Sequence, residues 1–330
     1  RASIEGVVPM RRFALFLSIF ALTLSIHVSA PAQTPEAAVN NFKNALKKAG
    51  NGDLDGAIED YTRAIALSSR VETAKTSSSR TGNSFTAGGG DASPASDIVV
   101  VDPFIANAYS NRGLARYQKG DLEGAMADLN QAIRIRPTLA VAYLNRAAVQ
   151  RAQMEPAAAV KDLDRAISLD KDLFQAFSNR GSLRLDMGDP QGALADLNRA
   201  IEIKDNIAEP YYHRGYVQLA LKDFDAAIVD FEKAIKLAPN MAWAYQGLGT
   251  AWMYKGHMER AIENFDRVIA QDPAIAWAYC NRGVANVYLG HETQAQADFD
   301  QCVKLRPDLK SQVEKRAELA RALRRIGKQD

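Results

Sequence analysis

Apolar and polar positions along this chain recur with a strict period of 34 residues. Each period holds two segments with helical apolar spacing and a short polar turn between them. The segment that opens each period places Ala, an aromatic residue, Asn, Arg and Gly in a fixed order in its clearest copies. The six copies begin at Asn107, Val141, Gln175, Glu209, Trp243 and Trp277. A period of this length is typical of solenoids, in which each unit buries its apolar face against the next.

The period predicts six consecutive helix pairs within residues 103–309. They cover 106–139, 140–173, 174–207, 208–241, 242–275 and 276–309. Asp121 and Asp189 stand where the second helix of a pair needs an N-cap. Pro156 and Pro190 occupy first helical positions, where a missing N–H is tolerated.

Small residues recur inside both predicted helices. The first helices carry Gly113, Ala147, Gly181, Gly215, Gly249 and Gly283, and the second helices carry Ala125, Ala159, Ala193, Ala227, Ala261 and Ala295. Gly in a helix interior costs about 1 kcal/mol relative to Ala. Its recurrence therefore indicates that the two helices of a pair approach each other closely.

The segments around these six blocks are less regular. Residues 33–68 predict an atypical first repeat, as is usual at the end of a solenoid. Residues 69–102 are rich in Gly, Ser and Thr, and they predict a disordered insertion that leaves the register of the array intact. Residues 310–330 contain an amphipathic stretch from Ser311 to Ile326, which predicts a helix that caps the last repeat.

The repeated residues resemble the tetratricopeptide repeat. In the first block they are Tyr109, Gly113, Ala125, Leu129, Ala132 and Pro137. The resemblance covers nearly all of 38–309, and its Asn-Arg-Gly segments look like those of bacterial members. It implies an all-α, right-handed superhelical solenoid of about seven repeats with a C-terminal capping helix. It also implies a protein that binds proteins or peptides along a concave groove.

A row of arginines and a row of aspartates accompany the repeats. The matched residues are Arg112 and Asp128, Arg146 and Asp162, Arg180 and Asp196, Arg214 and Asp230, and Arg282 and Asp298. One repeat has Leu248 in place of Arg and Asn264 in place of Asp. Because the two charges are lost together, the rows predict ion pairs within a repeat or between adjacent repeats. A phosphate-binding row of arginines is the less favoured alternative.

The resemblance places candidate peptide-binding residues on the first helices. They are Asn111, Asn145, Asn179, Tyr212, His213, Tyr216, Trp243, Gln246, Met253, Trp277 and Asn281. Amides can bind the backbone of an extended peptide, and exposed aromatic residues are favoured as anchors at interfaces. Packing of Trp243 and Trp277 between repeats is an equal alternative. The paired lysines with which family members bind a C-terminal carboxylate are not matched.

The sequence offers little for catalysis or for cofactors. His257 and His291 share a turn position, and no Cys or carboxylate cluster with metal-ligand spacing accompanies them. No nucleophile elbow, phosphate-binding loop or HExxH motif occurs, and the repeats leave no room for a catalytic domain. We therefore expect no enzyme activity, no cofactor, no metal and no small-molecule substrate.

The N-terminal residues have the three-part pattern of a secretory signal peptide. Arg11 and Arg12 precede an uncharged apolar run from Phe13 to Ile26, and Ala30-Pro31-Ala32 offers a cleavage site. Residues 1–32 are thus predicted to be upstream residues and a cleavable signal, and the mature protein is expected to be exported, and periplasmic if Gram-negative. An uncleaved membrane anchor is the alternative; otherwise no stable anchor is expected.

Charge and cysteine content refine this picture. Loss of residues 1–32 would remove three arginines and one glutamate and leave 38 basic and 38 acidic residues. A chain without net charge offers no general field for nucleic acid, so we expect no nucleic-acid partner. Cys280 and Cys302 either form a disulfide or are small buried apolar residues.

Two functions follow from the sequence. The first is an exported, non-enzymatic scaffold that binds a protein or peptide in its groove. The alternative is an accessory or regulatory subunit of a cell-envelope enzyme or secretion complex, docking through residues 69–102 or through the convex face.

Overall fold

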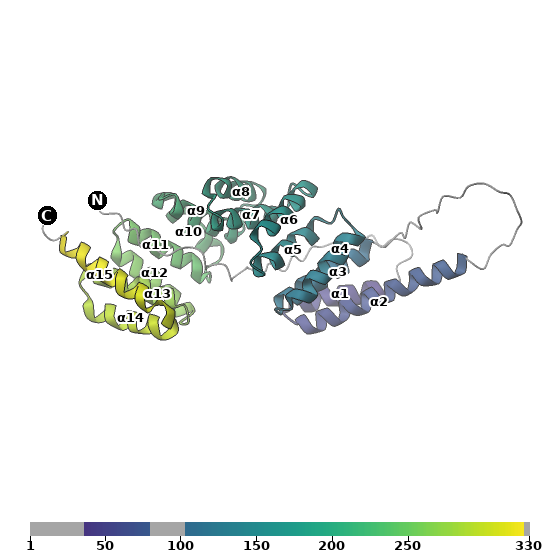
Figure 1. Cartoon of the computed structure of the whole chain (residues 1–330), viewed down its shortest axis with the longest axis horizontal. Helices are drawn as coiled ribbons and strands as arrows, with labels where there is room; N and C mark the ends of the chain where they lie inside the picture. The colour runs from purple at the N-terminus through teal and green to yellow at the C-terminus, as the bar shows by residue number, and fades with distance from the viewer. Residues whose placement is uncertain (1–35, 80–102, 327–330) are drawn as a thin grey trace, which may run out of the picture. The chain divides into compact units, whose positions relative to one another are not determined.

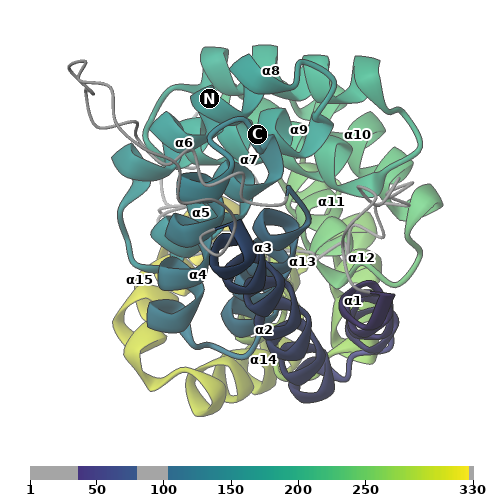
Figure 2. The same ribbon diagram turned by 90° about the vertical axis from the view of Figure 1, so that its right-hand side faces the viewer.

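The computed structural model describes residues 36–79 and 103–326, which form fifteen α-helices and a short 3₁₀ turn at Pro307–Leu309 (Figures 1 and 2). No residue in these two ranges lies in a β-strand. The helices follow one another as seven helix–turn–helix pairs and a final single helix, α15. The described chain is therefore all-α, with the repeating pairs that the period predicts.

The chain divides into two compact units at the bond between Ala176 and Phe177. The first unit contains three helix pairs, namely α1 (Glu36–Gly50) and α2 (Leu54–Ser79), α3 (Pro103–Gln118) and α4 (Leu122–Ile135), and α5 (Ala140–Ala152) and α6 (Pro156–Leu169). Each helix of this unit packs against the next one along the chain, from α1 to α6. Successive pairs are therefore stacked.

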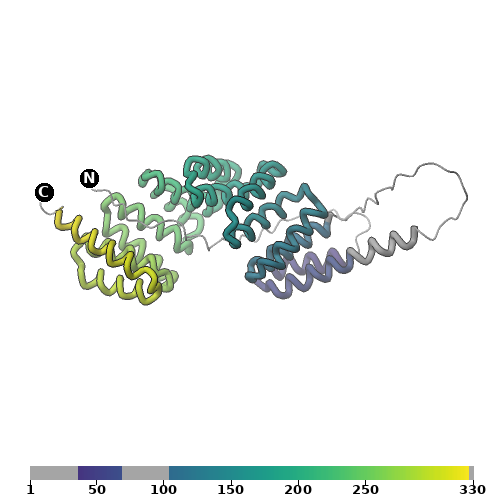
Figure 3. The backbone as a smooth tube through the Cα atoms, in the orientation of Figure 1, coloured from purple at the N-terminus to yellow at the C-terminus, as the bar shows by residue number. Residues whose placement is uncertain are grey.

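The second unit begins inside α7 (Phe174–Asp186) and repeats this arrangement (Figure 3). Its further helices are α8 (Pro190–Ile203), α9 (Ala208–Ala220), α10 (Phe224–Leu237), α11 (Ala242–Tyr254), α12 (Met258–Gln271), α13 (Ala276–Leu289), α14 (Glu292–Leu305) and α15 (Lys310–Ile326). Helices α8, α10 and α12 each contact the first helix of the following pair, and α15 contacts α13 and α14. The final helix thus covers the end of the last pair.

Side-chain carboxylates cap the N-termini of two second helices, as predicted from the sequence. Asp121 accepts a hydrogen bond from the backbone N–H of Gly124 at 2.8 Å, and Asp189 accepts one from Gly192 at 2.9 Å. These bonds satisfy N–H groups that have no partner within the helix.

The turn inside each pair requires one residue in the left-handed backbone region. Gly120 and Gly188 adopt it with φ of 83° and 84°, at no steric cost for glycine. Met154 and Lys222 occupy the equivalent position with φ of 64° and 63°. A residue with a Cβ atom loses about 1–2 kcal/mol in this conformation. These two turns are therefore strained.

The small residues let the two helices of a pair touch. A Cβ atom on Gly113 would lie 2.9 Å from Cγ of Leu129, and one on Gly249 would lie 2.7 Å from Cε1 of Phe265. Neither position has room for a methyl group unless the opposing side chain moves. The recurring alanines of the second helices are fully buried in the same seam, as Ala125 and its equivalents show.

One boundary differs from its prediction. Helix α2 continues past Ser68 and ends at Ser79. Neither Gly nor Pro occurs between these residues, so nothing in the sequence interrupts a helix that has already formed. Residues 80–102 of the predicted insertion and the predicted signal segment 1–32 lie outside the described residues. None of the described helices is long and apolar enough to cross a membrane.

Candidate functional site

Arg112 joins three helices through its guanidinium group. Its Nε and Nη2 atoms donate to the two carboxylate oxygens of Asp128 on α4, at 2.9 and 2.7 Å, and Nη1 donates to the Thr62 hydroxyl on α2 at 2.9 Å. The centroid of the Tyr109 ring lies 5.3 Å from Cζ. Two parallel charge-assisted bonds fix both distance and orientation. Arg112 therefore fastens α3 to its own partner helix and to the preceding pair.

The same contacts recur at a constant spacing. Bidentate pairs sixteen residues apart join Arg146 to Asp162, Arg180 to Asp196, Arg214 to Asp230, and Arg282 to Asp298. Three of these arginines also donate to the side chain sixteen residues earlier, which is Asn130 for Arg146, Asn198 for Arg214, and Asp266 for Arg282. The pairs lie within a repeat, with a second contact to the preceding one. The arginine row is thus engaged in structural contacts.

The repeat at 242–275 replaces this arrangement with apolar packing. Leu248 is 6% exposed and belongs to a cluster with Phe231 and Trp252. Asn264 donates instead to the Arg260 carbonyl of its own helix at 2.8 Å. The Arg260 guanidinium lies over Trp252, with Cζ 4.5 Å from the ring centroid. Leu248 has no hydrogen-bond donor in its side chain. This repeat therefore lacks the hydrogen bond that arginines at the equivalent positions donate to the preceding pair.

First helices of neighbouring pairs contact one another directly. In the first unit α3 contacts α5, and in the second unit α9 contacts α11, α11 contacts α13, and α13 contacts α15. We call these contacting helices, α3 and α5 in the first unit and α9, α11, α13 and α15 in the second, the inner layer.

The asparagines predicted to face the groove lie where neighbouring first helices pack. Asn145 is 8% exposed and its Nδ2 donates to the Ser110 hydroxyl on α3 at 3.2 Å. Asn281 is 3% exposed and accepts a hydrogen bond from α15 at 2.8 Å. Asn111 and Asn179 are half-buried. The prediction that this row offers free amides to a peptide is wrong for Asn145 and Asn281, because close helix packing encloses these short side chains.

Five half-buried side chains of the inner layer form what we call the aromatic surface. They are Tyr212, His213, Tyr216, Trp243 and Trp277. The Tyr212 ring meets His213 and Tyr216 edge-on, with centroids 4.9 and 5.1 Å apart. The Tyr216 hydroxyl donates to the Trp243 carbonyl at 3.4 Å, which links α9 to α11. These contacts hold the rings in fixed orientations.

The two tryptophans of this surface serve the inter-repeat core as well. Trp243 and Trp277 pack against a buried cluster of Val268, Ile275 and Ala278, and both keep part of their surface exposed. Packing between repeats is therefore confirmed for both residues, and their role in binding a peptide stays a prediction. Each indole stabilises a junction between pairs and still presents apolar area to solvent.

Two other predicted groove residues are buried. Met253 is 3% exposed and lies in the core cluster with Met258 and Phe265, so its assignment to the groove is wrong. Its neighbour Tyr254 is half-buried, since a one-residue step along a helix turns the side chain by about 100°. Gln246 is 2% exposed, and its Oε1 atom has no hydrogen-bond partner among the described residues.

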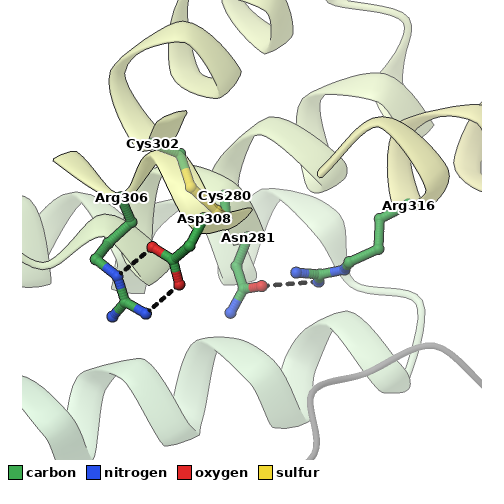
Figure 4. Close-up of a disulfide and its surroundings, with 6 residues drawn as sticks. All are labelled: Cys280, Asn281, Cys302, Arg306, Asp308 and Arg316. Atoms are coloured by element: carbon green, nitrogen blue, oxygen red, sulfur yellow. Dashed lines mark hydrogen bonds and ion pairs between the residues drawn. A yellow bond between two sulfur atoms is a disulfide. The ribbon is translucent and has the colours of Figure 1, made fainter. Parts of the chain in front are cut away.

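A buried arginine on α15 was missed by the sequence analysis. Arg316 on α15 is 8% exposed, and its Nη2 donates to Oδ1 of Asn281 at 2.8 Å (Figure 4). The sequence predicts a capping helix over this segment and assigns no role to Arg316. The signal that could have found it is its position 34 residues after Arg282, in register with the arginine row.

The cysteines and histidines are also placed by the structure. Cys280 of α13 and Cys302 of α14 form a disulfide (Figure 4). His257 and His291 stand directly before α12 and α14 and make no side-chain capping bond there. Within residues 36–79 and 103–326, no group of three His, Cys, Asp or Glu side chains is arranged to hold a metal ion.

Comparison with known families identifies the repeats. The model of the TPR repeat matches residues 113–153, and models of the tetratricopeptide repeat match residues 174–207, 208–241 and 278–309. The last three segments coincide with the pairs α7–α8, α9–α10 and α13–α14, and the segment 113–153 runs from within α3 to the end of α5. No curated protein sequence matches the chain.

Solved structures share this fold at low sequence identity. A tetratricopeptide repeat protein from Parabacteroides merdae is 16% identical with a TM-score of 0.56, and the match covers 86% of this chain and 98% of that one. PilF of Pseudomonas aeruginosa is 22% identical with a TM-score of 0.57, covering 64% and 97%. PilW, a type IV pilus biogenesis factor, is 16% identical with a TM-score of 0.58, also covering 64% and 97%. These likenesses concern the fold alone.

Proposed function

Because this chain belongs to the tetratricopeptide repeat family, we propose that it is a non-enzymatic scaffold that binds a protein or peptide along its inner layer. Repeats of this family generally act as modules for protein interaction, which supports the coarse assignment. The finer assignment, to the aromatic surface on α9, α11 and α13, is supported by the contacts of that surface.

The observation that supports this assignment is that these rings are half-exposed and are held in place by neighbouring side chains. Aromatic side chains offer large apolar area with few rotatable bonds, and they are enriched among residues that dominate binding energy. Edge-on contacts restrain Tyr212 and Tyr216, and core packing restrains Trp243 and Trp277. A restrained surface loses little conformational entropy when a partner binds. The aromatic surface therefore has the properties of a preorganised anchor site.

The test is a crosslinking pull-down with the double variant Trp243→Ala/Trp277→Ala. We expect the wild-type protein to capture a defined partner and the double variant to lose most of it. Tyr245→Ala is the matched control, because Tyr245 is a half-buried aromatic residue of the same cluster that lies outside the aromatic surface. If the double variant captures every partner of the wild-type protein, the assignment of the binding site to the aromatic surface is contradicted.

We also propose export to an oxidising compartment, the periplasm if the source is Gram-negative. The support is the signal-like sequence of residues 1–32 and the pairing of Cys280 with Cys302, since structural disulfides persist in such compartments. Fusion of residues 1–32 to a reporter that is active only after export tests this proposal. Reporter activity is expected, and an inactive fusion protein that stays in the cytosol would contradict the proposal.

An accessory role through residues 69–102 makes a different prediction. Deletion of this segment would then abolish partner capture. Binding along the inner layer predicts retained capture, because the deletion joins two segments in register and leaves the aromatic surface unchanged.

A further inference from the structure

Helix α15 closes the second unit and carries large apolar side chains on its solvent side (Figure 1). Leu319 is 39% exposed and Ile326 is 60% exposed, and no other described helix has two large apolar side chains exposed in this way. A helix that caps a solenoid is expected to turn a polar face to solvent. The solvent side of α15 therefore differs from that of an ordinary cap.

The inner side of α15 is fixed on its own unit. Val313 and Ala317 lie in a core cluster with residues of α13 and α14. Arg321 and Arg324 pair with Glu292 at the start of α14, at 3.0 and 3.4 Å. These contacts hold α15 in one orientation, so its exposed apolar residues stay on the outside.

The exposed residues of α15 have the spacing of a contact between two helices. Lys315, Leu319, Ala322 and Ile326 are all exposed and follow one another at steps of four, three and four residues. Apolar residues with this spacing line the seam of a coiled coil. The small side chain of Ala322 lets a second helix approach closely, and the aliphatic stem of Lys315 can cover apolar surface while its charge stays in water. We call these four residues the α15 seam.

Charges beside the α15 seam favour a second copy of the same helix as its partner. Glu318 and Arg325 are exposed on one flank of the seam, and neither forms an ion pair with any described residue. Two antiparallel copies can place Leu319 of one beside Ala322 of the other. Glu318 of each copy then comes close to Arg325 of the other. In two parallel copies each residue would lie level with its own equivalent, and neither charge would have an opposite charge beside it.

We propose that the α15 seam binds the α15 seam of a second copy of this chain in an antiparallel dimer with two-fold symmetry. A two-fold contact uses the same patch on both subunits, so one self-complementary surface is sufficient. The proposal goes beyond partner binding at the aromatic surface and does not depend on it. A contact confined to one pair of helices, each about 25 Å long, is at the small end of protein interfaces. We therefore expect a reversible dimer whose population rises with protein concentration.

Sedimentation velocity measures the self-association. Between about 1 μM and 1 mM protein, the sedimentation coefficient should rise from that of a monomer to that of a dimer. Leu319→Lys/Ile326→Lys should stay monomeric over the same range. Both side chains are exposed, so the Tm of this variant should match that of the wild-type protein. A wild-type protein that remains monomeric at every concentration would overturn the proposal.

Charge reversal tests whether the two seams are complementary. Glu318→Arg alone and Arg325→Glu alone should each weaken the dimer about tenfold or more, because each change places like charges at both symmetric contacts. An equimolar mixture of the two variants should dimerise again, as should the double variant, since opposite charges then meet at every contact. Lys304→Glu is the matched control, because Lys304 is exposed on α14 and lies outside the seam. If both single variants dimerise as the wild-type protein does, the proposal is wrong.

A spin label determines the direction of the two helices. Ser311 is exposed near the start of α15, and the two native cysteines are joined to each other, so Ser311→Cys offers a single thiol for labelling. In an antiparallel dimer the two labels lie near opposite ends of the helix pair, about 30 Å apart. In a parallel dimer they would lie about 10 Å apart. A dimer with the short distance, or one whose labels do not interact, would overturn the proposed arrangement.

Discussion

Arg214 and Asp230 form two parallel hydrogen bonds of 2.7 Å between α9 and α10. The aspartate side chain is 4% exposed and that of the arginine is 22% exposed. The hydrogen bond from Arg214 to Asp230 also raises the pKa of the arginine. A pair in this setting stabilises the fold mainly because each charge would be left unpaired without the other.

Removal of one partner is therefore expected to be worse than removal of both. Arg214→Met or Asp230→Leu alone should lower the free energy of unfolding by about 3 kcal/mol, and the double variant should lose clearly less than the sum. Urea unfolding of the four proteins measures the coupling. Strict additivity would show that the pair does not act as a unit.

The seam between helices makes a second prediction. Gly249→Ala should destabilise the protein by about 1–3 kcal/mol, because the new Cβ would lie 2.7 Å from Phe265. Gly50→Ala is the control, since a Cβ at Gly50 would meet nothing within 4 Å. The control should be neutral or slightly stabilising. Equal effects of the two changes on Tm would contradict close packing at Gly249.

The strained turn at Met154 makes a third prediction. Met154→Gly should stabilise the protein by about 1 kcal/mol, because glycine adopts a φ of 64° without steric cost. The side chain is 82% exposed, so little packing is lost. Gly120→Met places the same strain in an unstrained turn and should have the opposite sign in thermal unfolding. A loss of stability in Met154→Gly would mean that the methionine side chain has a stabilising role.

The disulfide makes a fourth prediction. It closes a loop with a sequence separation of 22 between α13 and α14. Cys280→Ala/Cys302→Ala should lower stability by about 3 kcal/mol, as expected for a loop of this size. Thiol titration in denaturant should find no free thiol in the untreated protein and two after reduction. Two reactive thiols before reduction would mean that the bond does not form.

The sequence predicted those features that repeat. The period determines the helix pairs, and the joint loss of Arg and Asp at Leu248 and Asn264 indicates the ion pairs of the other repeats. Both features recur along the array, so a position that departs from the pattern in one repeat is informative.

The sequence predicted less well which way a side chain points. Asn145 and Asn281 were placed in the groove by family position, but the close approach of neighbouring first helices encloses them. Met253 is predicted to face the groove but lies in the core, and the adjacent Tyr254 is half-buried, because adjacent residues on a helix face different directions. Arg316 was hidden because α15 lacks the glycine and aromatic residues that mark a repeat, and only its spacing from Arg282 connects it to the array.

The central claim, that a partner binds at the aromatic surface of the inner layer, is tested most directly by site-specific photocrosslinking. A photoreactive residue is placed at His213, on the aromatic surface, or at Val229, a 64% exposed position on the second helix α10. The account predicts one dominant crosslinked partner from His213 and none from Val229. Crosslinking from Val229 with none from His213 would contradict it.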